Sequence, residues 1–255
     1  MSNIALVTGA TAGIGEAIAV KLAENKYNLI ITGRRADRLH KLAGELMDRY
    51  KIQVLPLVFD VRVQQEVNEA IDSLSDNWIA IDVLVNNAGL AVGLNSLQEG
   101  VVDDWERMID TNIKGLLYVT RKLSPLMIER GVGGHIVNIG SIAGKEVYPN
   151  GNVYCGTKHA VDAITRGMRI DMVQHGIKVT AIHPGAVDTE FSLVRFKGDD
   201  DKAKNVYNGF TPLYANDIAD AVIFTLTRPE SVNINDMVIM PTAQASATVI
   251  HKKTL

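Results

Sequence analysis

Short apolar runs alternate with longer amphipathic segments along the whole chain. Most of the runs are almost purely apolar, which is typical of strands that helices cover on both faces of a parallel sheet. Because parallel neighbours need crossover connections, the alternation predicts an α/β fold with a doubly wound, seven-stranded parallel sheet and helices on both faces. The expected strands are Ile4–Thr8, Asn28–Thr32, Gln53–Val58, Val83–Asn86, His135–Ile139, Lys178–Ile182 and Met237–Met240, and the expected helices are Gly13–Glu24, Ala36–Tyr50, Gln64–Asp76, Asp104–Arg130, Val153–Gln174 and Asn216–Thr227.

The expected strands are spread evenly over the 255 residues, so we expect one domain, 1–255, rather than two. One region, about 188–212, has no clear strand pattern. A loop of this length in a compact domain is usually functional, and we interpret it as a lid over a site. A charged surface loop would explain its acidic run, Asp199–Asp201, but not its aromatic side chains. The tail, about 241–255, has no obvious element of its own.

The charge and cysteine content of the chain restrict its partners. The formal net charge is −3, which disfavours nucleic acid and anionic membranes. Every apolar stretch is interrupted before the about 18 residues that a membrane span needs, and the first residues lack the features of a signal peptide. Cys155 is the single cysteine, so no intrachain disulfide can form, and we expect a protein of a reducing compartment, the cytoplasm. The Cys155 thiol itself is expected to be small and buried. His183 and the other histidines show no metal-ligand clustering, so we predict no metal site.

Three glycines follow the first expected strand. Gly9, Gly13 and Gly15 allow a tight turn, a close approach of the backbone to a ligand and close packing of the next helix. The start of that helix offers free N–H groups and the positive end of its dipole to a pyrophosphate. An ordinary glycine-containing turn is the alternative, since the spacing G-x-x-x-G-x-G differs from the more common G-x-G-x-x-G. The position of the glycines favours a Rossmann-type dinucleotide-binding domain.

The end of the second expected strand indicates which dinucleotide binds. Arg34 and Arg35 stand where NAD-binding proteins carry an acid that accepts hydrogen bonds from the ribose. Guanidinium groups suit a 2′-phosphate, which a carboxylate would repel. Asp37, the only nearby acid, is interpreted as a first-turn residue of the next helix. We therefore predict NADP as the cofactor; two solvated arginines without a ligand are the alternative.

Two further loops lie at the carboxyl ends of central strands, where ligands bind in such sheets. Asp60 and Val61 follow the third strand, and the Asp60 carboxylate is placed to hydrogen-bond an adenine. The run Asn86–Gly89 follows the fourth strand, and its small residues would let a cofactor lie against the backbone. Plain turn chemistry is the alternative for both loops.

Tyr154 and Lys158 are four residues apart in a segment with helical periodicity, so they share one face. A tyrosine hydroxyl titrates near ~10, and a nearby ammonium would lower its pKa toward the range for proton exchange with an alcohol. Ser141 follows the fifth strand at the same edge of the sheet, where its hydroxyl would hold a substrate oxygen. Asn112 is a polar residue among apolar neighbours in the preceding helical segment. Each signal is weak alone, but all four in this order on a dinucleotide fold are specific.

With these motifs the chain resembles the classical short-chain dehydrogenases/reductases over essentially its whole length. The resemblance rests on TGATAGIG (Thr8–Gly15), NNAG (Asn86–Gly89), Asn112, Ser141, YCGTK (Tyr154–Lys158) and HPG (His183–Gly185). It implies that Tyr154 is the general acid/base and that Lys158 adjusts its pKa and binds the nicotinamide ribose. It also implies that Ser141 orients the substrate oxygen and that Asn112 holds a water in a proton relay. The residues expected to contact the cofactor are Gly9, Thr11, Gly13, Ile14, Gly15, Arg34, Arg35, Asp60, Val61, Asn87, Ala88, Gly89, Tyr154, Lys158, Pro184, Gly185, Val187 and Thr189.

Segments outside these motifs, at 190–200, 232–235 and 241–246, are similar to the NADP-dependent 3-hydroxy acid dehydrogenase branch of that family. This branch oxidises the 3-hydroxyl of serine, allo-threonine and related short acids such as 3-hydroxypropionate, and reduces matching semialdehydes. The resemblance therefore implies hydride transfer between the nicotinamide and C3 of a short 3-hydroxy or 3-oxo acid. A 3-oxoacyl thioester or general carbonyl reductase on the same scaffold is the first alternative, and a non-catalytic NADP-sensing regulator is the second.

A substrate carboxylate must be paired once water is excluded from the site. Arg195 in the lid is the candidate partner, because its forked donors suit a carboxylate, and Lys197 is the second choice. A solvated lid arginine is an equally weighted alternative. Lys145 and Glu146, just beyond Ser141, are expected to line the pocket as well.

The family resemblance also implies a homotetramer formed by the long helices expected within Asp104–Arg130 and Val153–Gln174. The apolar residues of both segments exceed a single stripe, and exposed apolar area of that size usually marks an interface. The tail after Pro241 is then placed to reach a neighbouring subunit.

Overall fold

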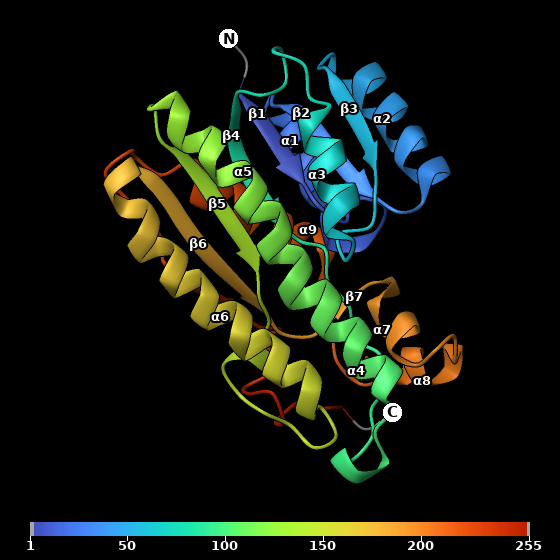
Figure 1. The fold of residues 1–255 in the computed structure, drawn as a ribbon. Helices are drawn as coiled ribbons and strands as arrows, with labels where there is room; N and C mark the ends of the chain where they lie inside the picture. The colour runs from blue at the N-terminus through green and yellow to red at the C-terminus, as the bar shows by residue number, and fades with distance from the viewer. Residues whose placement is uncertain (1–2, 254–255) are drawn as a thin grey trace.

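A computed structural model describes residues 3–253 of the chain. Its centre is a seven-stranded parallel sheet with the strand order β3-β2-β1-β4-β5-β6-β9, which confirms the predicted architecture (Figure 1). The strand order reverses direction between β1 and β4, and in such sheets the ligand crevice lies at the carboxyl ends of the strands beside this point. The strands are β1 (Ile4–Val7), β2 (Asn28–Gly33), β3 (Val54–Val58), β4 (Ile81–Asn86), β5 (Gly134–Ile139), β6 (Ile177–Pro184) and β9 (Asp236–Ile239).

Helices cover both faces of the sheet, and each face has its own hydrophobic core. Helices α1, α2 and α9 pack on one face and α3, α5 and α6 on the other (Figure 1). Successive strand residues point to opposite faces, so Val7 belongs to the first core and Leu6 to the second, and both are fully buried. Burial on both faces is why the strands are apolar without alternation. The helices are α1 (Gly13–Glu24), α2 (Ala36–Tyr50), α3 (Gln64–Asp72), α4 (Val102–Ile109), α5 (Leu116–Arg130), α6 (Asn152–Met172) and α9 (Ala215–Leu226).

One expected helix, Asp104–Arg130, is interrupted. Helices α4 and α5 are separated by a π-helical turn at Asp110–Gly115, where the wider turn accommodates an extra residue. The turn brings Gly115 against the cofactor-side loop, since a Cβ on Gly115 would lie only 2.8 Å from Val61 Cγ2. Helix α3 also ends earlier than expected, at Asp72, where the Ser73 hydroxyl donates to a carbonyl of the last turn.

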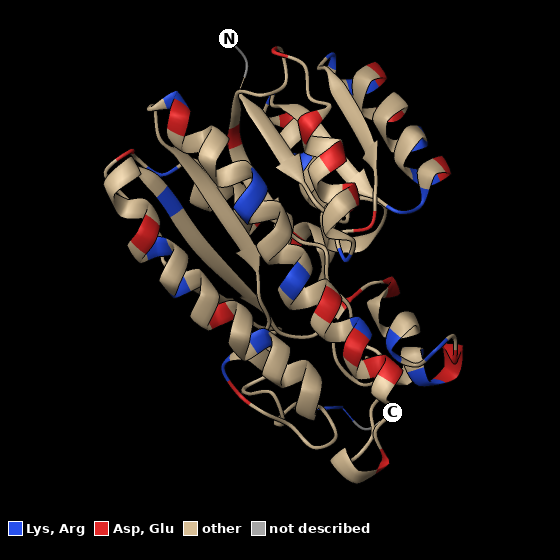
Figure 2. Ribbon diagram, in the orientation of Figure 1, with Lys and Arg blue, Asp and Glu red and all other residues tan. Residues whose placement is uncertain are grey.

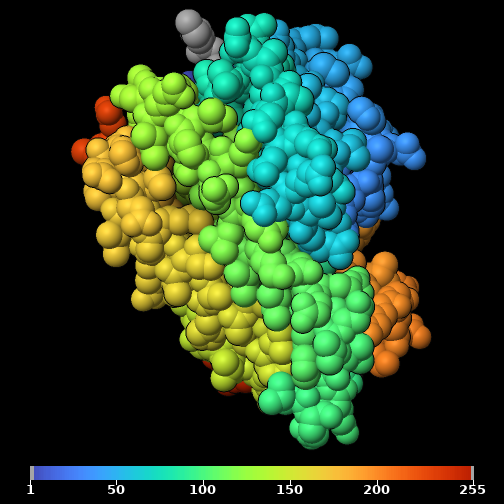
Figure 3. All heavy atoms as spheres, in the orientation of Figure 1, coloured from blue at the N-terminus to red at the C-terminus, as the bar shows by residue number. Residues whose placement is uncertain are grey.

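The region expected as a lid contains short helices rather than an open loop. Thr189 caps the first of them by accepting a hydrogen bond from Phe191 N, and Asp199 caps the second from Lys202 N. The lid forms a separate lobe beside α4 (Figure 3, orange beside green). Its elements are β7 (Val187–Asp188), α7 (Glu190–Arg195), α8 (Asp200–Asn205) and β8 (Leu213–Tyr214), and β7 and β8 pair in a two-stranded sheet.

The tail has little regular structure, as expected, apart from an isolated bridge between Gln244 and Ile250. It packs against its own chain, where Lys253 N donates to Gly209 O at 2.8 Å. Charged side chains lie mainly on the helices and loops, while the strands are nearly free of them (Figure 2). Among residues 3–253, no helix combines the length and apolar character needed to cross a membrane.

Candidate active site

A cavity of about 380 Å³ lies at the carboxyl ends of the central strands. All eighteen residues predicted to contact the cofactor line it, and so does Ser141. The residues come from the loops that follow the strands β1 to β6 and from helix α6, and the sheet topology brings these segments to one edge. The site is therefore one continuous hollow that runs from the Arg34–Arg35 pair to the Tyr154–Lys158 pair.

The glycine turn has no room for side chains. Gly9 has a positive φ of 68°, and a Cβ there would lie 2.9 Å from Ala88 Cα. A Cβ on Gly15 would lie 2.3 Å from Gly9 O, so the first turn of α1 packs directly on the loop before it. Asn87 Nδ2 donates to Thr8 O at 2.9 Å and fixes the two loops together. This cradle leaves backbone N–H groups at a helix start facing the cavity, which is the geometry that a pyrophosphate requires.

Arg34 and Arg35 lie at the opposite end of the cavity from Tyr154. The Arg34 guanidinium is 3.6 Å from the Asp60 carboxylate, and its side chain is 59% exposed. Arg35 donates from Nε and Nη2 to Thr11 Oγ1 at 3.1 and 2.9 Å, which ties it to the glycine turn. Asp37 lies in the first turn of α2, as expected. The donor set at this end is cationic and partly solvated, which fits a 2′-phosphate.

Tyr154 and Lys158 occupy successive turns of α6 and both line the cavity. Their relative exposures are 8% and 6%, so this end of the site is nearly dry. Lys158 Nζ donates to Ile139 O at 2.9 Å, which anchors the ammonium at the end of β5. Ser141 follows directly, and its Oγ accepts a hydrogen bond from Ala143 N at 3.1 Å. The three side chains therefore meet where β5 ends and α6 begins.

The pKa of Tyr154 is shifted in the direction opposite to the one expected. Burial, and then the neighbouring Tyr148 hydroxyl, raise the pKa of Tyr154, while Ser141 and Arg195 act to lower it. Burial also lowers the pKa of Lys158 to about 8. The protein chain without its cofactor therefore does not show the lowered pKa of Tyr154 that the Tyr154–Lys158 spacing predicts. Here a nearly dry site favours the neutral form of both groups.

Asn112 is buried in the π-helical turn and does not line the cavity. Its Oδ1 accepts from Leu90 N at 2.8 Å, and its Nδ2 donates to Leu90 O and to Thr157 Oγ1 at 2.9 and 3.0 Å. A Cβ on Gly89 would lie 3.3 Å from Asn112 Oδ1 and 3.6 Å from Lys158 Nζ. The side chain thus fixes the loop after β4 against α6 beside the lysine.

The lid places Arg195 next to Tyr154. Its guanidinium carbon lies 5.5 Å from the centre of the Tyr154 ring and 5.2 Å from that of Tyr148. One guanidinium nitrogen donates to the Tyr148 hydroxyl, while the buried Arg195 Nε has no hydrogen-bond partner in the described chain. Arg195 itself is not among the residues that line the cavity, although Phe191 and Val194 of the same helix are.

Three other predicted pocket residues have different partners. Lys197 Nζ is paired with Asp104 Oδ2 at 2.8 Å and holds the lid to α4, so the interpretation of Lys197 as a second carboxylate ligand is not supported. Lys145 and Glu146 are absent from the cavity wall, which corrects that expectation. Lys145 Nζ lies 2.6 Å from Asp162 Oδ1, and Glu146 accepts from a tail amide.

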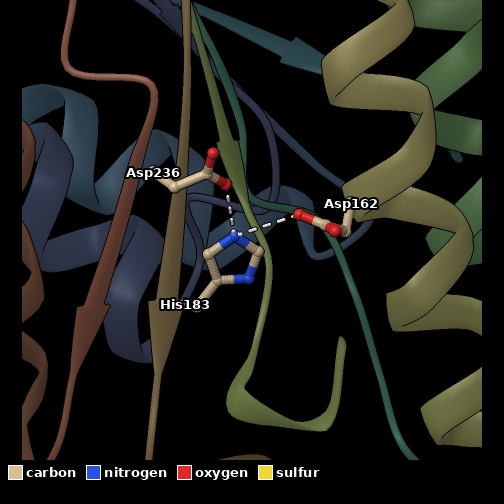
Figure 4. A group of neighbouring side chains, drawn as sticks. All are labelled: Asp162, His183 and Asp236. Atoms are coloured by element: carbon tan, nitrogen blue, oxygen red, sulfur yellow. Dashed lines mark hydrogen bonds and ion pairs between the residues drawn. The ribbon is translucent and has the colours of Figure 1, made fainter. Parts of the chain in front are cut away.

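His183 belongs to a cluster that the sequence analysis missed, in which His183 and Asp162 are buried and Asp236 is exposed. Its Nε2 lies 3.2 Å from Asp236 Oδ1 and 3.5 Å from Asp162 Oδ1, although the three residues are far apart in sequence (Figure 4). Its Nδ1 lies 3.2 Å from Ser141 O, so the cluster supports the backbone of a site residue. Burial, and then Lys145, lower the pKa of His183. Lys145 contacts both carboxylates, which makes this group an ion-pair network with its own cation rather than an open set of metal ligands.

The cavity wall also contains residues that the sequence analysis did not assign to the site. Arg107 and Thr111 come from α4 and the π-helical turn, and Glu190 and Phe191 from the lid. The Phe191 and Tyr154 rings lie 5.8 Å apart, so the lid covers the tyrosine. The aromatic content of the lid was the only feature of the sequence that indicated this contact. No feature of the sequence predicts the contacts of Glu190 with Arg35 and Arg38.

Comparison with known proteins agrees with this geometry. Residues 3–199 match the family model described as short chain dehydrogenase. A Salmonella typhi protein named NADP-dependent 3-hydroxy acid dehydrogenase YdfG is 49% identical over 98% of this chain and 99% of its own length, and sulfoacetaldehyde reductase 2 of Chromohalobacter salexigens is 44% identical over 96% of each. The closed form of serine dehydrogenase complexed with NADP+ is similar with a TM-score of 0.91 and 46% identity, over 98% of this chain and 100% of the other. This chain therefore belongs to the short-chain dehydrogenase family.

Proposed function

We propose that the protein is an NADP-dependent oxidoreductase that transfers a hydride between the nicotinamide and C3 of short 3-hydroxy or 3-oxo acids. The observation that carries the proposal is the single cavity that joins the glycine turn and Arg34–Arg35 to Ser141, Tyr154 and Lys158. Relatives named as NADP-dependent 3-hydroxy acid dehydrogenase and as serine dehydrogenase, each matched over nearly the whole chain, support the substrate class.

The residues present fit NADP(H) along the whole cavity. The glycine cradle would hold the pyrophosphate, and Arg34 and Arg35 would pair with the 2′-phosphate. The loop Asn87–Gly89 would lie against the cofactor, and Lys158 would reach the nicotinamide ribose. When bound, the cofactor supplies or accepts the hydride.

The proton is exchanged by Tyr154. In reduction its hydroxyl donates the proton to the substrate oxygen, and in oxidation the phenolate takes that proton back. The Ser141 hydroxyl would hold the same oxygen, and the fixed positions of the two groups favour the reactive geometry. Because burial raises the pKa of Tyr154, the chain by itself favours the protonated phenol, which is the form needed for reduction. Ser141 and the Arg195 guanidinium act in the other direction, since both lower the pKa of Tyr154 and so favour the phenolate needed for oxidation.

Arg195 is the proposed partner of the substrate carboxylate. Its buried Nε–H has no hydrogen-bond partner among the described residues, and a buried donor of this kind is costly unless a ligand satisfies it. Arg195 lies beside the Tyr154 ring, so a short acid whose carboxylate binds to Arg195 would be long enough to place its reacting oxygen near the Tyr154 hydroxyl. Arg195→Gln should lower kcat/KM for 3-hydroxypropionate by about 10- to 200-fold, the equivalent of a lost charged hydrogen bond. The same variant should reduce a neutral ketone at nearly the wild-type rate.

We also propose a homotetramer in the cytoplasm. Helix α6 exposes Ile170 at 74%, and the turn after it exposes Val173 at 71%, while α5 exposes Leu117 at 39%. Apolar side chains this exposed on adjacent helices support a subunit interface there. The compartment is supported by a single free, buried cysteine. Sedimentation of the purified protein tests the assembly.

A panel of substrates followed by NADPH absorbance tests the reaction. We expect turnover of serine, allo-threonine or 3-hydroxypropionate, and of malonic semialdehyde in the other direction. Strong turnover of acetoacetyl thioesters with none of the short acids would favour the alternative thioester reductase. Sulfoacetaldehyde belongs in the panel, because a relative at 44% identity is named as its reductase and a sulfonate is an anion that Arg195 can also pair.

A further inference from the structure

One acidic side chain of the lid contacts the arginines of the cofactor site. The Glu190 carboxylate accepts from Arg38 Nη1 at 2.9 and 3.0 Å and from Arg35 Nη1 at 3.0 Å. Arg35 and Arg38 are in the connection between β2 and α2 and in the first turn of α2, more than 150 residues away in sequence. Since Arg35 also donates to Thr11, it is held between the glycine turn and the lid.

The carboxylate is charged, but its ion pairs are weak. Hydrogen bonds from Arg35 and then from Arg38 lower the pKa of Glu190, so it is ionised at neutral pH. The side chains of Arg35, Arg38 and Glu190 are 44, 51 and 49% exposed. Pairs with this exposure contribute about 0.2–1 kcal/mol each, so another anion can replace the carboxylate at small cost.

The carboxylate and the 2′-phosphate would meet at the same donor. Arg34, Arg35 and Glu190 all line the cavity, whereas Arg38 does not. Arg34 already lies near Asp60, so Glu190 places a second anion at the end of the site that must accept a dianion. A 2′-phosphate that binds Arg35 must either displace the Glu190 carboxylate from Arg35 or bind next to this negative charge. Arg38 gives Glu190 a position to which it can withdraw.

We propose that Glu190 is a specificity-determining residue for the cofactor: it competes with the 2′-phosphate for Arg35 and so reduces the preference for NADPH over NADH. With NADH, which has no 2′-phosphate, the carboxylate stays on both arginines. With NADPH it is confined to Arg38. The inference rests on the proposed function, because it takes Arg34 and Arg35 as the 2′-phosphate ligands.

The test compares Glu190→Gln with the wild-type protein. The dissociation constants of NADPH and NADH are measured by the fluorescence of the bound nicotinamide at low salt. Glu190→Gln should bind NADPH about 1.4- to 5-fold more tightly, the equivalent of one exposed ion pair, and should bind NADH as the wild type does. Asp199→Asn is the matched control, since it removes one lid charge that contacts Lys202 and no cofactor-site arginine, and asparagine still caps α8.

Two results would overturn the inference. An unchanged ratio of NADPH to NADH affinity in Glu190→Gln, equal to that of Asp199→Asn, would show that the carboxylate does not compete. Weaker NADPH binding would show that Glu190 instead holds the arginines in place for the phosphate. Arg35→Ala separates these outcomes from failure of the proposed function: if it weakens NADPH and NADH equally, the 2′-phosphate assignment itself is wrong, whatever Glu190→Gln does.

Discussion

The two ends of the cavity differ in their contact with water. At the end proposed to be catalytic, Tyr154 and Lys158 are less than 10% exposed, and burial shifts both pKa values so that the neutral forms are favoured. At the other end, proposed to bind the 2′-phosphate, the side chains of Arg34 and Arg35 are 59% and 44% exposed and pair with carboxylates that solvent also reaches. Burial sets proton affinity, whereas exposed charges select a ligand by its charge and are screened by salt. One fold thus keeps proton chemistry and cofactor recognition in separate environments.

The largest effect is expected at the buried end. Tyr154→Phe should lower kcat by about 10²- to 10⁴-fold, because no other described group is placed to exchange the proton. The Phe191 contact is preserved by the phenyl ring, so NADPH affinity and the thermal midpoint should remain near wild type. Steady-state kinetics and thermal unfolding measure both. Substantial residual activity would assign proton exchange to another group.

The free energy of unfolding should depend on pH because of the buried side chain of His135. His135 is 4% exposed, and burial lowers its pKa to about 4, whereas an unfolded histidine titrates near ~6.5. As the pH falls through this window the unfolded chain binds the proton first, so the free energy of unfolding should fall by up to about 3 kcal/mol between pH 6.5 and pH 4.

Urea unfolding at about pH 7 and about pH 4.5 measures this loss. His135→Leu should reduce it, while His40→Gln, at an exposed position of α2, should not. An equal loss in all three proteins would place the pH dependence in other groups.

The exposed end should show a smaller and cofactor-selective effect. Replacing both Arg34 and Arg35 by alanine should weaken NADPH binding by about 10- to 100-fold, less than two buried charged hydrogen bonds would give, because solvent screens both side chains. NADH binding should change by less than about twofold. Equal losses for the two cofactors would contradict the contrast between the two ends.

Salt gives the smallest effect and needs no variant. Raising NaCl from about 0.05 to about 0.5 M shortens the screening length from about 14 to about 4 Å, so the NADPH dissociation constant should rise a few-fold more than that of NADH. The kcat at saturating cofactor should change less, because Tyr154 and Lys158 are buried. If salt changed only kcat and not the dissociation constant of NADPH, the exposed arginines would not be the charges that bind the cofactor.

The sheet was predictable from sequence because strands that are buried on both faces consist of continuous apolar runs, which can be read directly in the sequence. The glycine turn that lines the cavity was predictable too, since Gly9 and Gly15 meet a steric requirement that only glycine satisfies and that lies within a few positions of the chain. In both cases local sequence carries the constraint.

Other features depend on contacts that no local pattern records. Glu190 meets Arg38 across 152 positions, and His183 meets Asp236 across 53. The π-helical turn at Asp110–Gly115 places Gly115 against Val61, a contact that the helical periodicity of the sequence does not record. The direction of the Tyr154 pKa shift was missed for a related reason, because spacing places a cation near the phenol but says nothing about how dry the surroundings are.

The central place of β1 in the sheet has a consequence for synthesis of the chain. The strand pairs with β2 on one side, but its other neighbour, β4, is made more than 70 residues later. Asn87, which closes the glycine turn through Thr8 O and Gly9 O, emerges from the ribosome later still. A nascent chain therefore exposes its glycine turn before Asn87 can pack against that turn, and a cofactor that binds there can stabilise the fold only after the first third of the chain has been made.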